Sequence, residues 1–136
     1  MGPVRLAREL HERMLDQALA APEVEICALI GGSGTSPRTL YPVANVAGDP
    51  RQAFLMEPHA QLQAMREMRT AGEHLVGIYH SHPEGPAQPS ETDRAQAAYP
   101  DVLYFIAALS PDRRGGELRA FHFDGRAFQE LGIEIV

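Results

Sequence analysis

Cysteine, tryptophan and long apolar runs are scarce in this 136-residue chain, which has one Cys and no Trp. A single thiol excludes an intrachain disulfide and a zinc site closed by several thiolates. No stretch of about 18 apolar residues is present to cross a membrane, and residues 1–20 carry charges where a signal peptide would be apolar. We therefore expect a cytoplasmic protein that does not insert into a membrane, with Cys27 as a buried, reduced thiol.

Basic residues are also outnumbered, since 12 Lys and Arg face 18 Asp and Glu, for a net charge of -6. Surfaces that bind nucleic acid are usually rich in positive charge, so no nucleic-acid partner is expected. The length and a hydrophobic content of 44% predict a single domain over residues 1–136, because the chain supports one core but not two. No linker, repeat or low-complexity segment divides it.

Hydrophobic periodicity predicts a mixture of helices and strands. Apolar residues at every fourth position indicate an amphipathic helix over 4–20, and Pro58 opens a second helix that runs to about Arg69. Strands are expected over residues 24–31, 39–46, 54–56, 75–80, 102–109, 118–123 and 126–136, with turns at 31–34, 48–50, 111–116 and 124–125. Because 102–109 is almost entirely apolar, we expect it inside the sheet. The fold class is α/β, or more broadly α+β: a curved mixed sheet flanked by helices.

Two histidines follow the apolar run 75–79 and are separated by one residue. Side chains two apart on a strand face the same side, so His80 and His82 can direct their imidazoles at one point. Prolines through 83–89 prevent the strand from continuing and predict a loop that turns the chain back. A single His-x-His pair is common on surfaces and in cores, so by itself it does not identify a metal site.

A helix is expected to start just after this loop, with Ser90 as its N-cap and Asp93 in its first turn. Helix capping alone explains both residues. Together with the two histidines, however, Asp93 completes a set of three ligands, the number that leaves a tetrahedral zinc open for water. The full string His-x-His-x7-Ser-x-x-Asp is much rarer than its parts and indicates a metal centre that can do chemistry.

Other motifs with similarly spaced histidines do not match the chain. Zinc nucleobase deaminases need His-x-Glu followed by Pro-Cys-x-x-Cys, which one cysteine cannot provide. A hydrolase of the His-x-His-x-Asp-His type would need Asp and His where this chain has Glu84 and Gly85. A cupin would need a glutamate three or four residues beyond His82, where Gly85 and Pro86 stand.

The string, with the upstream Glu25-Ile26-Cys27-Ala28-Leu29, resembles the JAMM (MPN+) family of zinc metallopeptidases, in particular its small bacterial members. The resemblance covers essentially the whole chain and implies the MPN-like architecture, which is similar to that of cytidine deaminases, with Zn2+ as the cofactor. The residues implied at the site are the general acid/base Glu25, Ser90 as a group that holds the water or the oxyanion, and the zinc ligands His80, His82 and Asp93. One departure is Ala28, where the family usually has glycine, which adds a methyl group near the site.

Two glutamates two residues apart, Glu23 and Glu25, would face the same side of a strand. Glu25 begins the apolar run and fits the Glu-x-Cys pattern of the family, whereas Glu23 follows Pro22 at the end of the first helix. Glu25 is therefore preferred as the proton carrier, although an exposed carboxylate at a strand edge would also explain it. The remaining histidines are expected to have no catalytic role, namely His11, His59, His74 and His122.

The substrate class is implied by the family rather than by the residues. JAMM peptidases cut after the extended C-terminal tail of ubiquitin-like proteins, which often ends in Gly-Gly, and small bacterial relatives are associated with sulfur-carrier proteins of the ubiquitin fold. The resemblance thus implies a peptidase or isopeptidase for a ubiquitin-like or sulfur-carrier protein, acting by zinc-activated water with Glu25 as the base. Two alternatives stay open: a peptidase of broader specificity, and a non-catalytic MPN-like scaffold that binds metal.

Overall fold

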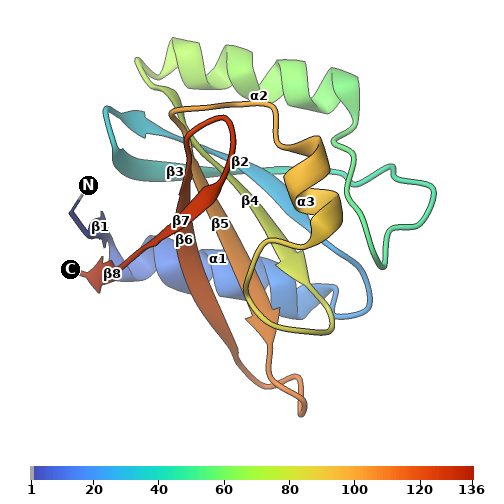
Figure 1. The fold of residues 1–136 in the computed structure, drawn as a ribbon. Coiled ribbons are helices and arrows are strands. Elements are labelled where there is room, and N and C mark those ends of the chain that lie inside the picture. The colour runs from blue at the N-terminus through green and yellow to red at the C-terminus, as the bar shows by residue number, and fades with distance from the viewer. Residues whose placement is uncertain (1) are drawn as a thin grey trace.

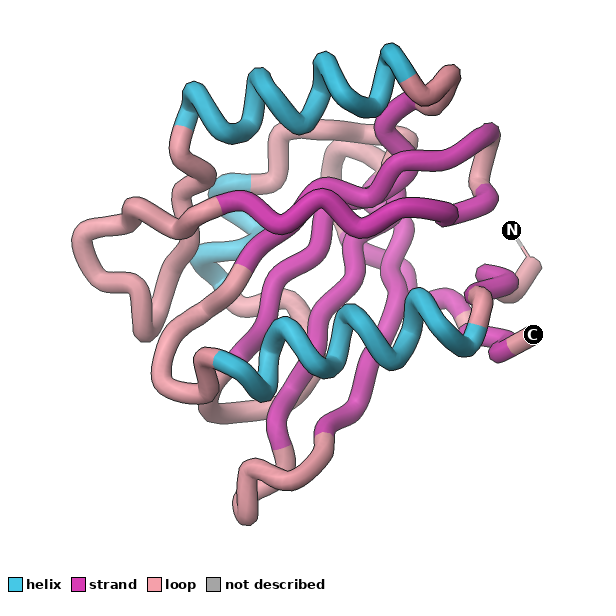
Figure 2. Tube along the Cα trace, turned by 180° about the vertical axis from the view of Figure 1, so that it is seen from behind, coloured by secondary structure: helices cyan, strands magenta, loops and turns pink. Residues whose placement is uncertain are grey.

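A computed structural model describes residues 2–136 (Figure 1). A six-stranded sheet has the strand order β3-β2-β4-β5-β6-β7, and β1 and β8 form a separate two-stranded sheet. In chain order the elements are β1 (Val4–Leu6), α1 (Arg8–Ala20), β2 (Cys27–Ser33), β3 (Ser36–Val43), α2 (Pro58–Thr70), β4 (His74–His82), α3 (Glu91–Gln96), β5 (Leu103–Leu109), β6 (Gly116–Phe123), β7 (Phe128–Leu131) and β8 (Ile133–Ile135). The expected class, a curved mixed sheet flanked by helices, is confirmed, and Figure 2 shows the sheet between α1 and α2.

Within the six-stranded sheet, β4 and β5 are parallel and the other neighbouring strands are antiparallel. Parallel neighbours need a crossover connection, and here α3 and the segments on either side of it make that connection. Strand β5 lies inside the sheet between β4 and β6, as its apolar sequence predicted. This connection starts at His82, where the His-x-His strand ends, and includes α3 before the chain enters β5.

The sheet separates two apolar cores. Successive residues of β2 alternate between them, since Ala28 and Ile30 pack on the α1 side while Cys27 and Leu29 pack on the α2 side. The helix residues buried in these cores are Leu10, Met14 and Ala18 of α1 and Ala64 and Met68 of α2. Burial of apolar surface on both faces is the main stabilising contribution to a sheet of this kind.

Both ends of the chain differ from expectation. The helix predicted over 4–20 begins only at Arg8, because residues Val4–Leu6 form β1 and pair in parallel with β8. The strand predicted over 126–136 is interrupted, with β7 in the large sheet and β8 in the small one. No short-range sequence pattern predicts that the first few residues of a chain pair with the last few. Within residues 2–136, no helix combines the length and apolarity needed to cross a bilayer.

The turn predicted at 31–34 is also wrong in part. Strand β2 continues through both glycines to Ser33, and the hairpin turns at Gly34, which has a positive φ of 61°. A side chain at Gly32 would place its Cβ 2.0 Å from the carbonyl oxygen of Ser36, so this glycine is needed for the close approach of β3. Residues 54–56 do not form the expected strand, but Met56 makes an isolated antiparallel bridge to Asn45.

Gly77 of β4 offers a test of the packing behind the site. A Cβ at this position would lie 2.8 Å from the ring of Phe105, which is fully buried, and 3.1 Å from the carbonyl oxygen of Leu103. We expect Gly77→Ala to lower the free energy of unfolding by about 1–3 kcal/mol through overpacking. The matched control is Gly115→Ala, where a Cβ meets nothing within 4 Å, and it should stay within about 0.5 kcal/mol of the parent. Urea denaturation of both variants measures the difference, and equal midpoints would contradict the packing described here.

Candidate active site

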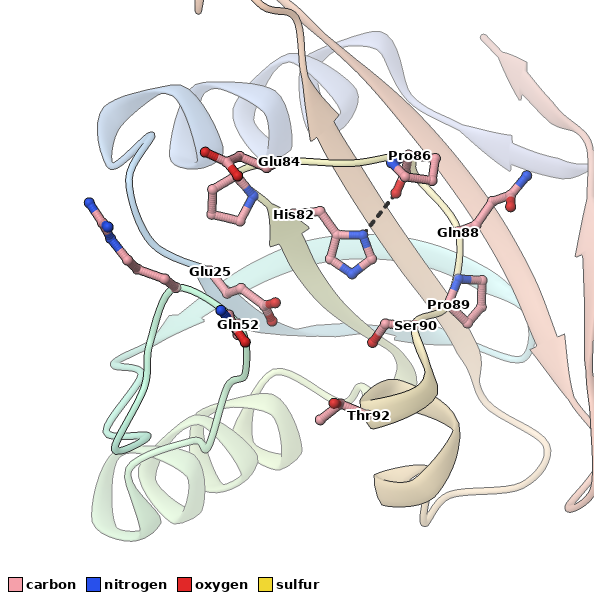
Figure 3. A pocket seen from close by; sticks show the side chains of 11 residues that line it. Glu25, Gln52, His82, Glu84, Pro86, Gln88, Pro89, Ser90 and Thr92 are labelled. Atoms are coloured by element: carbon pink, nitrogen blue, oxygen red, sulfur yellow. Dashed lines mark hydrogen bonds between the residues drawn. The ribbon is translucent and has the colours of Figure 1, made fainter.

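The candidate site lies where the end of β4 meets the residues that precede β2. In the antiparallel pairing of these strands Cys27 is opposite His80, so Glu25 lies close to the last residues of β4. His80 and His82 point to the α2 side of the sheet, as their alternation predicted, while Tyr79 on the opposite side packs in the core under α1 and donates its hydroxyl hydrogen to the carbonyl of Met14. Figure 3 shows Glu25, His82 and Ser90 directed into a common cleft.

The loop after β4 fixes the tautomer of His82. Its Nδ1 lies 2.9 Å from the carbonyl oxygen of Pro86 (Figure 3, dashed line). A carbonyl only accepts, so Nδ1 carries the hydrogen and the Nε2 of a neutral ring presents a lone pair. An imidazole held in this way by a backbone carbonyl is a typical metal ligand.

Helix α3 begins at the N-cap that the sequence predicted, and the two residues form a reciprocal capping box. Ser90 Oγ accepts the backbone N–H of Asp93 at 3.0 Å, and Asp93 Oδ2 accepts the backbone N–H of Ser90 at 2.9 Å. These bonds orient the Asp93 carboxylate toward the two histidines. Capping and participation in the site are therefore compatible roles for the same pair.

Three electron-pair donors converge at this point. His80 Nε2 lies 3.2 Å from His82 Nε2 and 3.2 Å from Asp93 Oδ1, and His82 Nε2 lies 3.0 Å from Asp93 Oδ2. Ligand atoms bound to one tetrahedral zinc at about 2.0–2.1 Å are separated by roughly 3.3 Å. The donor set thus has the chemistry and the spacing of a zinc site with one position left open.

Lone pairs of His82 Nε2 and a carboxylate cannot face each other at 3.0 Å without a cation between them. A proton on Nε2 also meets this requirement, because a protonated His82 donates to the carboxylate. Burial lowers the pKa of His82, but the hydrogen bond to Asp93 and the carbonyl of Pro86 outweigh it and raise the pKa overall. Burial likewise favours the neutral form of Asp93, yet the bonds from both histidines hold the pKa of its carboxyl well below the usual range.

His80 is held in a different way from its neighbour. It is 2% exposed, and its ring stacks on Phe54 with centroids 4.6 Å apart. Its Nδ1 has no hydrogen-bond partner among the described residues, so the stacking partner and the surrounding core set its orientation. Burial lowers the pKa of His80, which keeps the ring neutral and able to bind a metal. No local sequence pattern indicated Phe54, because its contact with His80 is long-range.

Glu25 is the buried carboxylate of the cleft. It is 4% exposed, whereas Glu23 is exposed to solvent. Burial raises the pKa of Glu25 to about 7, an effect that the charge of Asp93 reinforces and His82 opposes. A carboxyl group with this pKa both accepts and releases a proton near neutral pH, which is what a general acid/base requires.

The cleft has a volume of about 550 Å³ and is lined by polar and apolar groups alike. Its lining residues are Glu25, Arg51, Gln52, His82, Pro83, Glu84, Pro86, Gln88, Pro89, Ser90 and Thr92. None of the histidines for which no role was expected is among them. Cys27 is buried in the core on the α2 side of the sheet, where desolvation raises the pKa of its thiol to about 12, so it is protonated and a poor nucleophile.

Comparison with known proteins identifies related chains. The profile of the family described as prokaryotic homologs of the JAB domain matches residues 7–123. The desampylase of Haloferax volcanii is 36% identical over 137 residues, which cover 96% of this chain and 94% of the relative. A CysO-cysteine peptidase of Mycobacterium tuberculosis is 32% identical over 82% of this chain and 77% of its own. A probable TtuB-protein conjugate cleaving protease of Thermus thermophilus is 43% identical, over 48% of this chain and 45% of its own.

Solved structures agree with the observed fold. The solution structure of protein DSY2949 from Desulfitobacterium hafniense has a TM-score of 0.84 at 32% identity, with 98% of this chain and 92% of that chain covered. The structure reported as JAMM, a metalloprotease-like zinc site in the proteasome and signalosome, has a TM-score of 0.58 at 19% identity, over 98% of this chain and 99% of that chain. At the latter identity the likeness concerns the fold alone.

Proposed function

The chain belongs to the family of prokaryotic homologs of the JAB domain, and we propose that it is a zinc-dependent peptidase that cleaves after the C-terminal tail of a ubiquitin-like or sulfur-carrier protein. One observation carries the proposal: His80, His82 and Asp93 converge with the spacing of an open zinc site beside the buried Glu25. We further propose that residues 1–136 act as one domain.

Each residue of the cleft has a defined task in this proposal. His80, His82 and Asp93 would hold zinc, which when bound supplies Lewis acidity and lowers the pKa of a water to about 7. Glu25 accepts a proton from water in the cleft and returns it to the amine that leaves, because its pKa of about 7 suits both transfers.

Ser90 is assigned to the oxygen that becomes negative during the reaction. Its Oγ accepts one bond, from the N–H of Asp93, so its hydroxyl hydrogen is still available for donation. A hydroxyl beside the reacting carbonyl contributes to catalysis by stabilising the developing charge. The helix cap fixes the position of this hydroxyl before a substrate arrives.

The names of relatives support the proposed substrate class. Two relatives are called peptidase or protease, and their names refer to CysO-cysteine and to TtuB-protein conjugates. Both names describe one component joined to another, and a peptidase of this class would separate the two. A tail that ends in glycines can approach the cleft closely because it has no side chains near the scissile bond.

The first prediction from this proposal concerns the metal. Purified protein should bind about one zinc per chain, and His82→Ala or Asp93→Ala should weaken binding by more than the 10- to 100-fold typical of outer-sphere changes, since each removes a ligand. His59→Ala on α2 is the control and should bind normally. Competition with a chromophoric chelator gives the affinities. Unchanged affinity in both ligand variants would contradict the assignment.

The second prediction concerns proton transfer. Glu25→Gln keeps the shape of the side chain but removes the proton acceptor, so it should lower kcat on the order of 100- to 10,000-fold while the protein stays folded and zinc-loaded. Glu23→Gln, two residues away and exposed, should retain normal activity. Equal activity of the two variants would exclude Glu25 as the general base. If the parent protein itself cleaves none of the carriers tested, the result favours a non-catalytic scaffold.

The third prediction concerns the substrate tail. A ubiquitin-like carrier ending in Gly-Gly before its adduct should be cut after the second glycine. An Ala-Ala tail should react about tenfold more slowly or worse, which corresponds to a barrier raised by about 1.4 kcal/mol or more. Mass spectrometry of both products gives the site and the rate of cleavage. Equal rates, or cleavage elsewhere, would support a peptidase of broader specificity.

A further inference from the structure

Glu25 precedes strand β2, so the hydrogen bonds between strands do not hold its backbone. Strand β2 begins at Cys27, and its pairing with both neighbours starts there. In addition, Oε1 of the Glu25 carboxylate has no hydrogen-bond partner among the described residues. The position of this side chain therefore depends on the contacts that fix its own peptide groups.

Three contacts from outside β2 do so. The N–H of Glu25 donates to the carbonyl oxygen of Pro50 at 2.7 Å. The peptide between Glu25 and Ile26 is held on both sides, since Asn45 Nδ2 donates to its carbonyl oxygen at 2.9 Å and Ser81 Oγ accepts its N–H at 3.0 Å. Ser81, which lies between the two histidines, thereby ties this peptide to the end of β4.

The side chain of Asn45 also holds the loop that carries Phe54. Its Nδ2 donates to the carbonyl oxygen of Ala53 at 3.0 Å, and its Oδ1 accepts the N–H groups of Leu55 and Ala47 at 3.0 Å each. Two of these bonds are made by the residues on either side of Phe54. Phe54 in turn stacks on His80. The Asn45 amide therefore bonds both to the backbone of Glu25 and to the two residues that flank Phe54.

We propose that Asn45 is a positioning residue that fixes the location of Glu25 relative to His80. Its amide uses both of its donor hydrogens and accepts two bonds, which is the full capacity of the group. A fully bonded amide holds its partners in one arrangement. The inference rests on the proposed role of Glu25 as proton carrier and extends it to the residue that places this carboxylate.

The decisive variant is Asn45→Asp. It retains an acceptor for the N–H groups of Leu55 and Ala47, but when ionised it cannot donate to the carbonyl oxygens of Glu25 and Ala53. We expect kcat to fall on the order of 10- to 100-fold, as misplacement by about 1 Å can cause, with KM within about threefold of the parent. Zinc affinity should stay normal in Asn45→Asp and fall in Asn45→Ala, because only the second variant also releases the loop on both sides of Phe54.

The stability control is Thr39→Val. Thr39 donates its hydroxyl hydrogen to Glu73 at 2.7 Å and pairs with Gly31, away from the cleft. This change removes a side-chain hydrogen bond of comparable kind, so it should lower the melting temperature while kcat stays within twofold. All variants are assayed on the Gly-Gly carrier with its adduct at saturating zinc, with kcat, KM, zinc affinity and melting temperature measured for each.

Two outcomes overturn the inference: Asn45→Asp with kcat within twofold of the parent, or the same loss of kcat in Thr39→Val. If neither Asn45 variant folds, Asn45→Gln keeps the amide but displaces it by one methylene, and normal kcat in that zinc-loaded variant also overturns it. Failure of the proposed function looks different, since then the parent protein cleaves no carrier, or Glu25→Gln remains active. An inactive Glu25→Gln with a fully active Asn45→Asp rejects only the positioning role.

Discussion

Strands β2 and β4 run antiparallel, with Cys27 opposite His80. This register brings the start of one strand to the end of the other, and therefore Glu25 and His82 line the same cleft although 57 positions separate their numbers in the sequence. Because side chains alternate along a strand, a slip of one residue would turn the histidines toward the α1 core. The helix cap orients Asp93, the loop after β4 orients His82, and Asn45 holds the backbone of Glu25. These contacts act on groups that the register of β2 and β4 brings together.

Burial then gives the two carboxylates opposite properties. Asp93 is partly desolvated, but hydrogen bonds from both histidines and from the backbone of Ser90 keep it ionised. Among the described residues no such bond reaches the Glu25 carboxylate, and burial raises its pKa to about 7. A pair of carboxylates whose pKa values are pushed apart by their surroundings is a recurrent arrangement at catalytic sites. Here it separates a group suited to bind a cation from a group suited to carry a proton.

The helix cap and the strand alternation could be predicted because both are local. Ser90 and Asp93 are three residues apart and form the capping box that their spacing indicates, and His80 and His82 share a face of β4 for the same kind of reason. The errors fall where distant segments meet. Strand β1 pairs with β8 at the opposite end of the chain, and the bridge of Met56 to Asn45 replaces an expected strand. Such pairings depend on register rather than on periodicity.

The sequence by itself determined the fold class, the spacing of three donor groups and the helix that carries one of them, since these follow from neighbouring residues. It left open whether Glu25 was a buried acid or an exposed strand-edge carboxylate. Only the tertiary structure decided that question, because burial and the resulting pKa arise from elements that pack around a residue. The stacking of Phe54 on His80 and the four hydrogen bonds of Asn45 were likewise decided by tertiary structure. Both join groups far apart in the chain, and no pattern of short range encodes them.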